Sequence, residues 1–482
     1  MRAGERRSVV ATVAERQSKG GSDLRVRRAV RGAFLAFFVD MFDIYLPIVV
    51  LAPAMIYFVS PDLNDTASAI VGASIFAVTL IGRPLGAGIF GHFADTIGRK
   101  RTAMISITGF GVATLLMALL PGYQHWGIAA VSLFILLRFV DGIFLGGEYT
   151  AANPLAMEHS PRERRGFYSA VINSAFPLAY ACISLITLFL LFLMPSQGLD
   201  SPYVQWGWRI PFLIGAVLAF VFGVYYYFSV SESELWQGSG EKIGSPLRNL
   251  FSGDNLKSFL QVFVLMSGLW LSLQTVAAIL PGVLGKSVGL SNTNVTITLV
   301  IGYLVLIPAN LGAGVLGQRI GRRAFLIGAG VVMAVLATFL YYLLISAAPE
   351  NLFAVILLVT VVLVLVDLPF AIMPAYINER FHTGVRASGY GLGFSLAVVL
   401  PSLYAYYQAG LAIFMPFEYT VLVLLVVGAL LMVAGAVWGP ETKDVDFSED
   451  VEAAPETGER APESSPAEPR TAPGTDRPVG SS

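Results

Sequence analysis

Long apolar runs alternate with short polar segments along almost the whole chain. A membrane-spanning helix needs ~20 mainly apolar residues. Twelve runs meet this length, over residues 32–58, 67–93, 102–121, 127–150, 166–194, 208–228, 258–284, 294–317, 324–346, 352–376, 388–410 and 416–438. The pattern therefore predicts an all-α membrane protein with twelve transmembrane helices.

The composition supports this fold class. Of the 482 residues, 55% are hydrophobic and 13% are charged, whereas a soluble domain carries roughly 25% charged residues. So few charges cannot cover a water-facing surface of this size, and most of the exterior is expected to contact membrane lipids. The net charge of -1 argues against nucleic acid as a partner.

The charged residues between the runs are divided by sign. An even number of spans places both chain ends on one side of the membrane, and Lys and Arg concentrate on the cytoplasmic side. The connections on the side of the chain ends carry Arg99, Lys100, Arg101, Arg162, Arg164, Arg165, Lys242, Arg248, Arg319, Arg322, Arg323, Arg380 and Arg386. The opposite connections carry Asp62, Asp65, Asp200, Glu350 and Glu418, with Lys286 as their only clear cation. We therefore expect both termini in the cytoplasm.

Three polar segments set the expected domain boundaries. Residues 1–31 form a basic arm, expected to be a charged tail without fixed structure. Residues 230–256 are expected to form a cytoplasmic linker between six spans in 32–229 and six spans in 257–439. Residues 440–482 are crowded with Pro, Glu, Ser, Ala and Gly. They lack the apolar surface that would offset the entropy of ordering, so a disordered cytoplasmic tail is predicted.

Metal and cofactor chemistry has no support in the sequence. Cys182 is the only cysteine, which excludes an intramolecular disulfide and a multi-cysteine metal site. The four histidines are scattered without metal-ligand spacing. The chain also lacks a nucleophile–base arrangement and a phosphate-binding loop. An enzyme or a receptor is therefore disfavoured, and no cofactor is expected.

A glycine-hinged basic hairpin occurs at equivalent points of both halves. The first copy is Gly91–Arg101, in which Asp95 follows the end of the second span and Gly98 permits a tight turn into the third. The second copy is Gly314–Arg323, with Gln318 in the position of the aspartate. Such duplication is typical of transporters whose halves rock around a central site. The alternative is an ordinary basic turn.

The charges of these hairpins can hold helices together in one conformation and release them in another. Because Asp95 has no acidic counterpart in the second copy, the two latches should differ in strength. Together with an acidic residue near the cytoplasmic end of span four, the hairpins supply the predicted gating residues: Gly91, Asp95, Gly98, Arg99, Lys100, Glu148, Gly321, Arg322 and Arg323.

The first hairpin, Gly91-x3-Asp95-x2-Gly98-Arg99-Lys100, resembles the loop signature of the major facilitator superfamily. The preceding run Arg83-Pro84-Leu85-Gly86 resembles its metabolite:proton symporter branch. Further matching segments are Gly146-Gly147-Glu148-Tyr149, Glu158, Arg165-Gly166, Trp208-Arg209-Ile210-Pro211-Phe212, and Glu379 with Arg386 and Gly389. The resemblance covers about residues 30–440. It implies two pseudo-symmetric six-helix bundles (the major facilitator fold), alternating access, and proton-coupled uptake of small metabolites, often organic acids or zwitterions.

Two carboxylates lie in the first span. Asp40 and Asp43 are three residues apart, which puts both on one helix face. Two nearby carboxylates in low dielectric do not both ionise easily, so at least one is expected to bind and release a proton near physiological pH. Members of the resembled branch typically carry Glu where this chain has the shorter Asp40. The alternative is a permanent structural pair between Asp40 and Arg83.

Two arginines also lie within spans. Arg83, in the inner half of the second span, needs a carboxylate from the protein or from a substrate, unless it extends to the interface. Arg138 lies in the middle of the fourth span, three residues from Asp141, so an intrahelical ion pair is plausible. Members of the superfamily commonly carry Gln where Asp141 stands, which makes this aspartate a further titratable candidate.

Asp367 is the one ionised candidate deep in the second half, and the nearby Pro369 suggests a broken helix. A charged residue inside a span is a functional hypothesis by default; the alternative is a structural cap for freed backbone groups. We therefore predict proton coupling at Asp40, Asp43 and Asp141, and substrate binding at Arg83, Arg138 and Asp367.

These residues favour a secondary transporter that takes up a small carboxylate-bearing metabolite, an organic acid or a zwitterion, together with protons. The predicted location is the plasma (inner) membrane, and the predicted state is a monomer. The four intramembrane aspartates against two arginines would also suit cations. Proton-coupled efflux of drugs or cationic metabolites is therefore the alternative.

Overall fold

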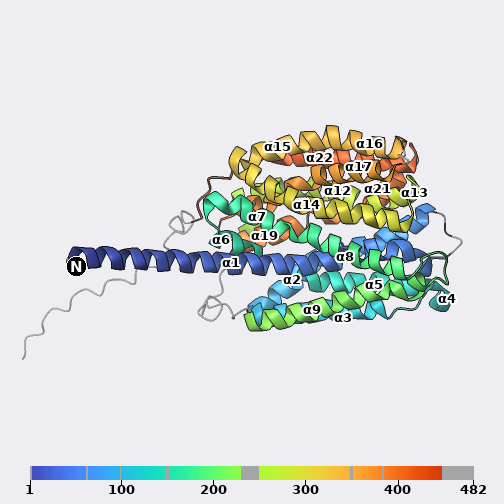
Figure 1. The fold of residues 1–482 in the computed structure, drawn as a ribbon, viewed down its shortest axis with the longest axis horizontal. Coiled ribbons are helices and arrows are strands. Elements are labelled where there is room, and N and C mark those ends of the chain that lie inside the picture. The colour runs from blue at the N-terminus through green and yellow to red at the C-terminus, as the bar shows by residue number, and fades with distance from the viewer. Residues whose placement is uncertain are drawn as a thin grey trace, which may run out of the picture.

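The computed structural model of the chain describes residues 3–447, apart from 61–62, 64, 98, 148–151, 230–248, 348–350 and 383–384. Every regular element in this part of the chain is helical, and most of the long helices run along one common direction (Figure 1). The described residues contain 12 segments that are long and apolar enough to cross a membrane. The predicted all-α fold with twelve transmembrane spans is therefore confirmed.

The first half of the chain contains six spans. Their elements are α1 (Ala3–Leu51) with the 3-10 turn Ala52–Tyr57, α2 (Asp65–Ile97), α3 (Arg99–Ala118), α5 (Ile128–Gly146), α7 (Arg165–Asn173) followed by α8 (Ala175–Leu193), and α9 (Arg209–Ser229), with the short helices α4 (Tyr123–Trp126) and α6 (Ala152–His159) between spans. Because α1 begins at Ala3, the basic arm continues the first span as helix. The expectation of a tail without fixed structure is corrected there.

The second half repeats the count of six. Its elements are α12 (Gly253–Gln274) with the π turn Thr275–Ile279 and α13 (Leu280–Lys286), α14 (Asn292–Ile320), α15 (Arg322–Val332) with the π turn Met333–Ala337 and α16 (Thr338–Ala347), α17 (Leu352–Asp367) with the 3-10 turn Leu368–Ile372 and α18 (Met373–Glu379), α19 (Arg386–Ser395) with α20 (Val399–Ser402) and α21 (Tyr404–Leu411), and α22 (Thr420–Trp438). Pro281 and Pro369 lie at two of the interruptions, where a missing backbone N–H does not break a regular ladder.

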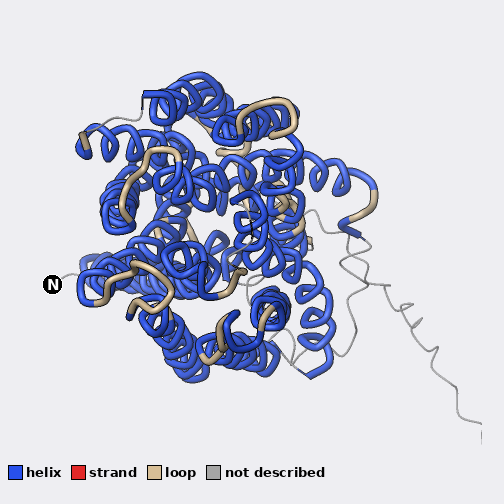
Figure 2. Tube along the Cα trace, turned by 90° about the vertical axis from the view of Figure 1, so that its right-hand side faces the viewer, coloured by secondary structure: helices blue, strands red, loops and turns tan. Residues whose placement is uncertain are grey.

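The two halves form two six-helix bundles. Figure 1 shows α2, α3, α5 and α9 on one side and α15, α16, α17 and α22 on the other, and Figure 2 gives a second view, turned by 90°. Within the bundles α2 packs on α5 and α12 packs on α22, whereas α14 of the second bundle packs on α7 and α8 of the first. The interface between the bundles therefore runs along α7, α8 and α14.

The two ends of the bundles differ in charge. The end at which α6, α7 and α19 lie, on the left in Figure 1, carries the basic connections and is called the basic end below. The short helices α4 and α13 lie at the opposite end. Of the expected linker 230–256, residues 230–248 lie outside the described residues, and α12 already begins at Gly253.

Glycines bring α2 and α5 into backbone contact. A Cβ at Gly86 of α2 would collide with the carbonyl oxygen of Ile143, and a Cβ at Gly142 of α5 would collide with that of Thr79. Burial of apolar surface gives no driving force between helices in lipid, so their association depends on close packing. Small residues allow the helix backbones to approach closely enough for it. This contact aligns Arg83 of α2 with the charged residues of α5.

The first residues of the expected disordered tail are packed against the basic end. Residues 440–447, called the C-terminal strap below, follow α22 directly. The carboxylate of Glu441 accepts hydrogen bonds from the backbone N–H groups of Arg322 and Arg323 (2.8 and 3.1 Å), at the start of α15. An anion at a helix N-terminus is favourable because the first N–H groups lack partners. The tail prediction is therefore wrong for this segment, and 448–482 lie outside the described residues.

The end of the strap touches both bundles. The Phe447 ring lies between two guanidinium groups, 3.8 Å from Arg165 of α7 and 3.9 Å from Arg386 of α19. The backbone carbonyl of Val445 also accepts a hydrogen bond from Arg165 (3.0 Å). Phe447 thus fixes the end of the strap through two favourable cation–π contacts. The polar composition of the tail as a whole does not predict this.

Gly86→Ala should lower the thermal unfolding temperature, because overpacking against Ile143 costs about 1–3 kcal/mol. Gly88→Ala is the matched control in the same helix: a Cβ there meets nothing within 4 Å, and Ala favours a helix over Gly by about 1 kcal/mol. Thermal unfolding of the detergent-solubilised protein, followed by tryptophan fluorescence, measures both. Equal unfolding temperatures for the two variants would contradict the close contact of α2 with α5.

Candidate functional site

Five charged side chains meet inside the first bundle. They come from α1, α2 and α5, and none is more than 4% exposed: Asp40 4%, Asp43 3%, Arg83 2%, Arg138 0% and Asp141 0%. Five residues that the sequence singled out as ionisable groups inside spans thus lie together in the structure. A charge at such a depth must be compensated by a partner, because an isolated ion in low dielectric is very costly.

The two aspartates of α1 contact different cations. Asp40 Oδ2 accepts a hydrogen bond from Arg83 Nη2 at 2.9 Å, which is the static pair considered above. Asp43 Oδ2 instead accepts from Arg138 Nη1 at 2.8 Å. One helix face thus presents its two carboxylates to two guanidinium groups.

Arg138 is shared by two carboxylates. Its Nη1 group also donates to Asp141 Oδ2, three residues along α5, at 2.8 Å, so the predicted intrahelical pair is present. Asp43 and Asp141 thus approach the same nitrogen atom of Arg138. Three carboxylates therefore stand against two guanidinium groups, and with all five ionised the cluster carries one excess negative charge.

Thr114 of α3 completes the Asp43 environment. Its hydroxyl oxygen lies 2.7 Å from Asp43 Oδ1 and 2.9 Å from the carbonyl oxygen of Phe110. A threonine hydroxyl carries one hydrogen and two lone pairs. It can donate to an ionised Asp43, or donate to Phe110 and accept from a protonated Asp43. The same contact therefore accommodates both protonation states of this carboxyl group.

Asp367 lies at the point where α17 gives way to the 3-10 turn Leu368–Ile372, so the break suggested by Pro369 is present. The side chain makes no capping hydrogen bond to that turn, which argues against the structural alternative. Asp367 Oδ2 accepts from Asn310 Nδ2 of α14 at 3.0 Å, whereas Oδ1 has no hydrogen-bond partner within the described chain. This carboxylate belongs to the second bundle and stands apart from the cluster of three.

An aromatic cluster joins the two bundles. Tyr180 of α8 stacks on Tyr303 of α14, with ring centroids 3.8 Å apart and an angle of 16°. Tyr45 of α1 lies 5.5 Å from Tyr180, and Phe176 presents its edge to Tyr303 at 5.7 Å. Tyr45 follows Asp43 by two residues, so the cluster of rings adjoins the cluster of charges.

The basic end is closed by a buried carboxylate. Glu379 at the end of α18 receives the Nε and Nη2 groups of Arg322, both at 3.2 Å, and lies 3.5 Å from Nη1 of Arg165 in the first bundle. Thr442 of the strap donates to the same carboxylate at 2.8 Å. Arg322, predicted from the second hairpin as a gating residue, is thus placed at the bundle interface.

Further contacts cross the interface nearby. Arg386 of α19 pairs with Glu158 of α6 at 2.8 Å, and the backbone N–H of Gly166 donates to Gln318 Oε1 at 2.8 Å. At the opposite end Asn292 donates to Ser196 at 3.0 Å. The bundles therefore touch at both ends, and each end must separate before anything can pass.

The remaining predicted gating residues divide into two groups. Arg323 contacts the Val437 carbonyl at 2.8 Å, Gly321 forms the turn before α15 with φ 98°, and Lys100 lies 4.6 Å above the Tyr227 ring. Of the others, Gly98 and Glu148 lie outside the described residues, and for Gly91, Asp95 and Arg99 the structure describes the helical backbone only. Their gating role, and the strength of the Asp95 latch relative to the second copy, remain predictions.

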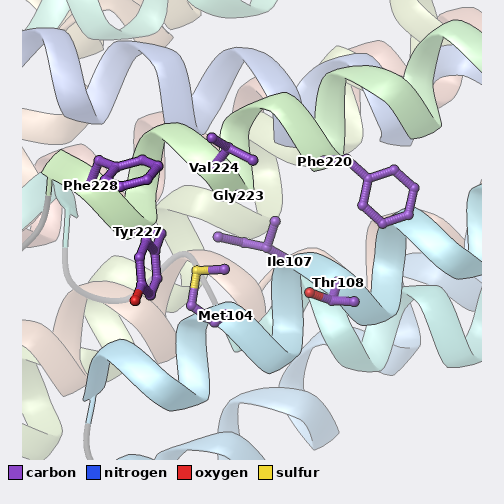
Figure 3. Close-up of a pocket in the computed structure, with 8 residues that line it drawn as sticks. All are labelled: Met104, Ile107, Thr108, Phe220, Gly223, Val224, Tyr227 and Phe228. Carbon is purple, nitrogen blue, oxygen red and sulfur yellow. The ribbon is translucent and has the colours of Figure 1, made fainter.

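An almost wholly apolar groove lies between α3 and α9 (Figure 3). Its volume is about 310 Å³, and it is lined by Met104, Ile107, Thr108, Phe220, Gly223, Val224, Tyr227 and Phe228. Several of these side chains are exposed, Phe228 at 80%. An apolar groove on the outside of one bundle suits contact with lipid chains.

In the described residues no group of three or more His, Cys, Asp or Glu side chains could hold a metal ion.

Sequence reasoning missed several residues of these sites. Thr114, Asn310 and Glu441 are single polar residues whose partners lie far away in the chain. Tyr45, Tyr180 and Tyr303 were not among the predicted site residues, because an aromatic residue in a span is more often a packing or lipid-interface residue than a ligand. A signal existed for Glu441, since it is the first acid after α22, but it could not identify the α15 N-terminus as the partner.

Comparisons with known proteins agree with this architecture. Residues 33–275 match the Major Facilitator Superfamily, and residues 232–453 match the Sugar (and other) transporter family. The inner membrane metabolite transport protein YhjE of Escherichia coli is 30% identical over 381 residues, which cover 77% of this chain and 84% of YhjE. The shikimate transporter of Escherichia coli is 28% identical, covering 78% and 85%.

A solved structure shares the fold. The xylose transporter XylE of Escherichia coli, in a partially occluded inward-open conformation, matches with a TM-score of 0.63 at 18% identity, over 88% of this chain and 99% of XylE. At this sequence identity the match supports a shared fold and no more. With twelve spans in two bundles and relatives that are inner-membrane transporters, the chain is a multi-pass plasma-membrane transporter rather than an enzyme, and it belongs to the major facilitator superfamily.

Proposed function

We propose that this chain is a proton-coupled symporter that takes up a small carboxylate-bearing metabolite by alternating access, as a monomer whose basic end faces the cytoplasm. The observation that carries the proposal is the sharing of Arg138 by Asp43 and Asp141, each at 2.8 Å from one guanidinium nitrogen. The relative named for shikimate, whose acid group is a carboxylate, supports the substrate class.

The excess carboxylate links proton binding to anion binding. Without a bound proton, the cluster of three carboxylates and two guanidinium groups repels an incoming anion through low-dielectric surroundings. One proton on Asp43 or Asp141 makes the cluster neutral. The proton therefore lowers the electrostatic cost of placing a substrate carboxylate nearby, which is the linkage that symport needs.

Arg83 is the proposed contact for the substrate carboxylate. Arg83 pairs with Asp40 of α1, and Tyr45 of the interface rings lies five residues further along the same helix. A guanidinium group can bind a carboxylate with two parallel hydrogen bonds. Arg138 is shared by Asp43 and Asp141 and is proposed to hold this proton-binding pair.

Alternating access requires the contacts at the basic end to break and re-form. Glu379, Arg165 and Arg322 join the bundles there, and Arg386 with Glu158 adds a second ion pair. The positive balance of this end supports its cytoplasmic orientation. Efflux antiport, the competing function, predicts the opposite net direction, and oriented vesicles distinguish the two.

Asp43→Asn and Asp141→Asn should each abolish proton-driven accumulation while retaining substrate exchange. Either change leaves Arg138 with one carboxylate and fixes the cluster in its neutral state, so anion binding no longer depends on a proton. Proteoliposome uptake under an imposed inward proton gradient, compared with counterflow without a gradient, measures the two activities. Accumulation by the unchanged protein that ignores the gradient would contradict symport itself.

Asp40→Asn provides the matched comparison. It also removes one negative charge, but it breaks the one-to-one pair with Arg83, and breaking a buried pair costs about 3–5 kcal/mol. This variant should therefore unfold at a lower temperature than Asp43→Asn and Asp141→Asn. Equal stability of all three would show that sharing of Arg138 does not protect the fold.

Glu379→Gln should open the basic end more often, because it removes the carboxylate that Arg165 and Arg322 share. In a Cys182→Ser background, Ser169→Cys places a thiol at the buried bundle interface, where Ser169 donates to the Ala371 carbonyl at 2.8 Å. A loss of about 1.4 kcal/mol in closure raises maleimide labelling from that side about tenfold.

Asp254→Asn is the control for this labelling experiment. It removes an acid from an exposed ion pair, with Lys257 at 3.0 Å, and exposed pairs contribute little. Labelling should stay at the level of the unchanged protein. Equal labelling in the Glu379→Gln and Asp254→Asn backgrounds would remove Glu379 from the gate.

A further inference from the structure

The charge environment of Asp367 differs from that of every other buried aspartate described above. Asp40, Asp43 and Asp141 each contact a guanidinium group. In the described part of the chain, no Lys or Arg forms an ion pair with Asp367, which is 1% exposed and hydrogen-bonded to Asn310 alone. A buried carboxylate with one amide partner still lacks compensation for its charge.

The Asp367 carboxylate lies near the aromatic cluster. Its partner Asn310 follows Tyr303 by seven residues, two turns along α14, so both side chains lie on the same face of that helix. Tyr303 is stacked on Tyr180, and both belong to the cluster that joins the bundles. The hydroxyl groups of Tyr45 and Tyr303 have no hydrogen-bond partner within the described residues, although both are buried. The Asp367 carboxylate and the hydroxyl groups of Tyr45 and Tyr303 thus retain hydrogen-bonding capacity that a ligand could use.

We infer that Asp367, Tyr45, Tyr180 and Tyr303 form a subsite for a cationic group, a secondary or quaternary ammonium, of the transported substrate. An ammonium supplies the charge that Asp367 lacks, and the faces of phenol rings attract cations. For the other end of the molecule the inference rests on the proposed function, in which Arg83 takes a carboxylate. The substrate class is then a small zwitterion.

Other substrate chemistries fit these groups less well. A neutral hydroxyl could satisfy Asp367 Oδ1 by a hydrogen bond, but it would leave the carboxylate charge uncompensated. A second carboxylate would be repelled by Asp367. An ammonium satisfies both requirements, and it also accounts for the aromatic rings, which a purely anionic substrate would not use.

The subsite is divided between the bundles. Tyr45 and Tyr180 belong to the first bundle, whereas Tyr303 and Asp367 belong to the second. A cation held among them is in contact with both, and its binding favours the conformation in which the bundles meet at this level. The Tyr180–Tyr303 stack occupies this place in the structure and has to separate when the cation enters.

The test uses pairs of ligands that differ in charge and share their shape. One pair is glycine betaine and 3,3-dimethylbutanoate, in which carbon replaces the quaternary nitrogen. The other pair is L-proline and cyclopentanecarboxylate. Affinities for the full-length protein are measured by ligand-induced thermal shifts. In at least one pair the cationic member should bind at least about tenfold tighter, as expected for a desolvated cation–π contact beside a carboxylate.

Three variants locate the effect. Asp367→Asn should abolish the preference for the cationic member by weakening that member alone. Tyr303→Phe keeps the ring face and should keep the preference, whereas Tyr303→Leu should reduce it. The tyrosine pair keeps the inference testable if Asp367→Asn does not fold, because Tyr303→Phe and Tyr303→Leu change a neutral side chain.

Each outcome is decisive. Binding of the carbon analogues as tightly as the cationic members, or no binding of either cationic member, overturns the subsite. Proton-driven accumulation of a carbon analogue together with no charge preference overturns the subsite and leaves the proposed symport intact. A charge preference lost in Asp367→Asn, without proton-driven accumulation, supports the subsite and overturns the symport.

Discussion

The structure depends on the cost of placing charge in a low-dielectric interior. Each buried guanidinium group of the first bundle is matched by a carboxylate, and the helices are positioned to make this possible: glycine contacts bring α2 against α5, so Arg83 and Arg138 both face α1. A cluster of this kind contributes little net stability, because desolvation offsets most of the attraction. Its value lies in the one carboxylate that exceeds the number of cations, since that imbalance makes the protonation state respond to a second charge.

The same rule governs the basic end, with a different consequence. Glu379 and Arg322 both belong to the second bundle, and Arg165 of the first bundle is the cation that Glu379 loses when the bundles separate there. The C-terminal strap extends this arrangement: Glu441 neutralises the start of α15, and Phe447 lies between two guanidinium groups. Separation of the bundles would expose these groups to water, which compensates charges well. The gate therefore exchanges protein partners for solvent, and neither state leaves an ion without a partner.

The sequence carried much of the fold and part of the site. Span length and apolar content predicted all twelve spans, because in lipid every backbone group must be satisfied inside a helix. Charge inside a span identified Asp40, Asp43, Arg83, Arg138 and Asp141. Burying a charge is costly, and a buried charge therefore indicates a partner or a function. The specific pairing was not available, because it depends on how far each helix is rotated about its axis. Neutral residues such as Thr114 and Asn310 were not predicted as site residues, since a neutral polar residue in an apolar helix costs less to bury than a charge and can bond to a nearby backbone carbonyl. The strap was misjudged for a related reason: overall composition hides one well-placed aromatic ring.

The two bundles are alike in fold but unequal in charge, and the inequality has a mechanical consequence. The first bundle contains both arginines of the central region and can approach neutrality by taking one proton, so its charge state can be set before a substrate arrives. The second bundle contributes Asp367, whose compensation has to come from a proton or from something that enters. A substrate with a single charge leaves one of the two bundles to be compensated by a proton. A substrate with a carboxylate at one end and an ammonium at the other can satisfy both bundles at once, so its own charges make closure of the bundles electrostatically favourable on both sides of the interface.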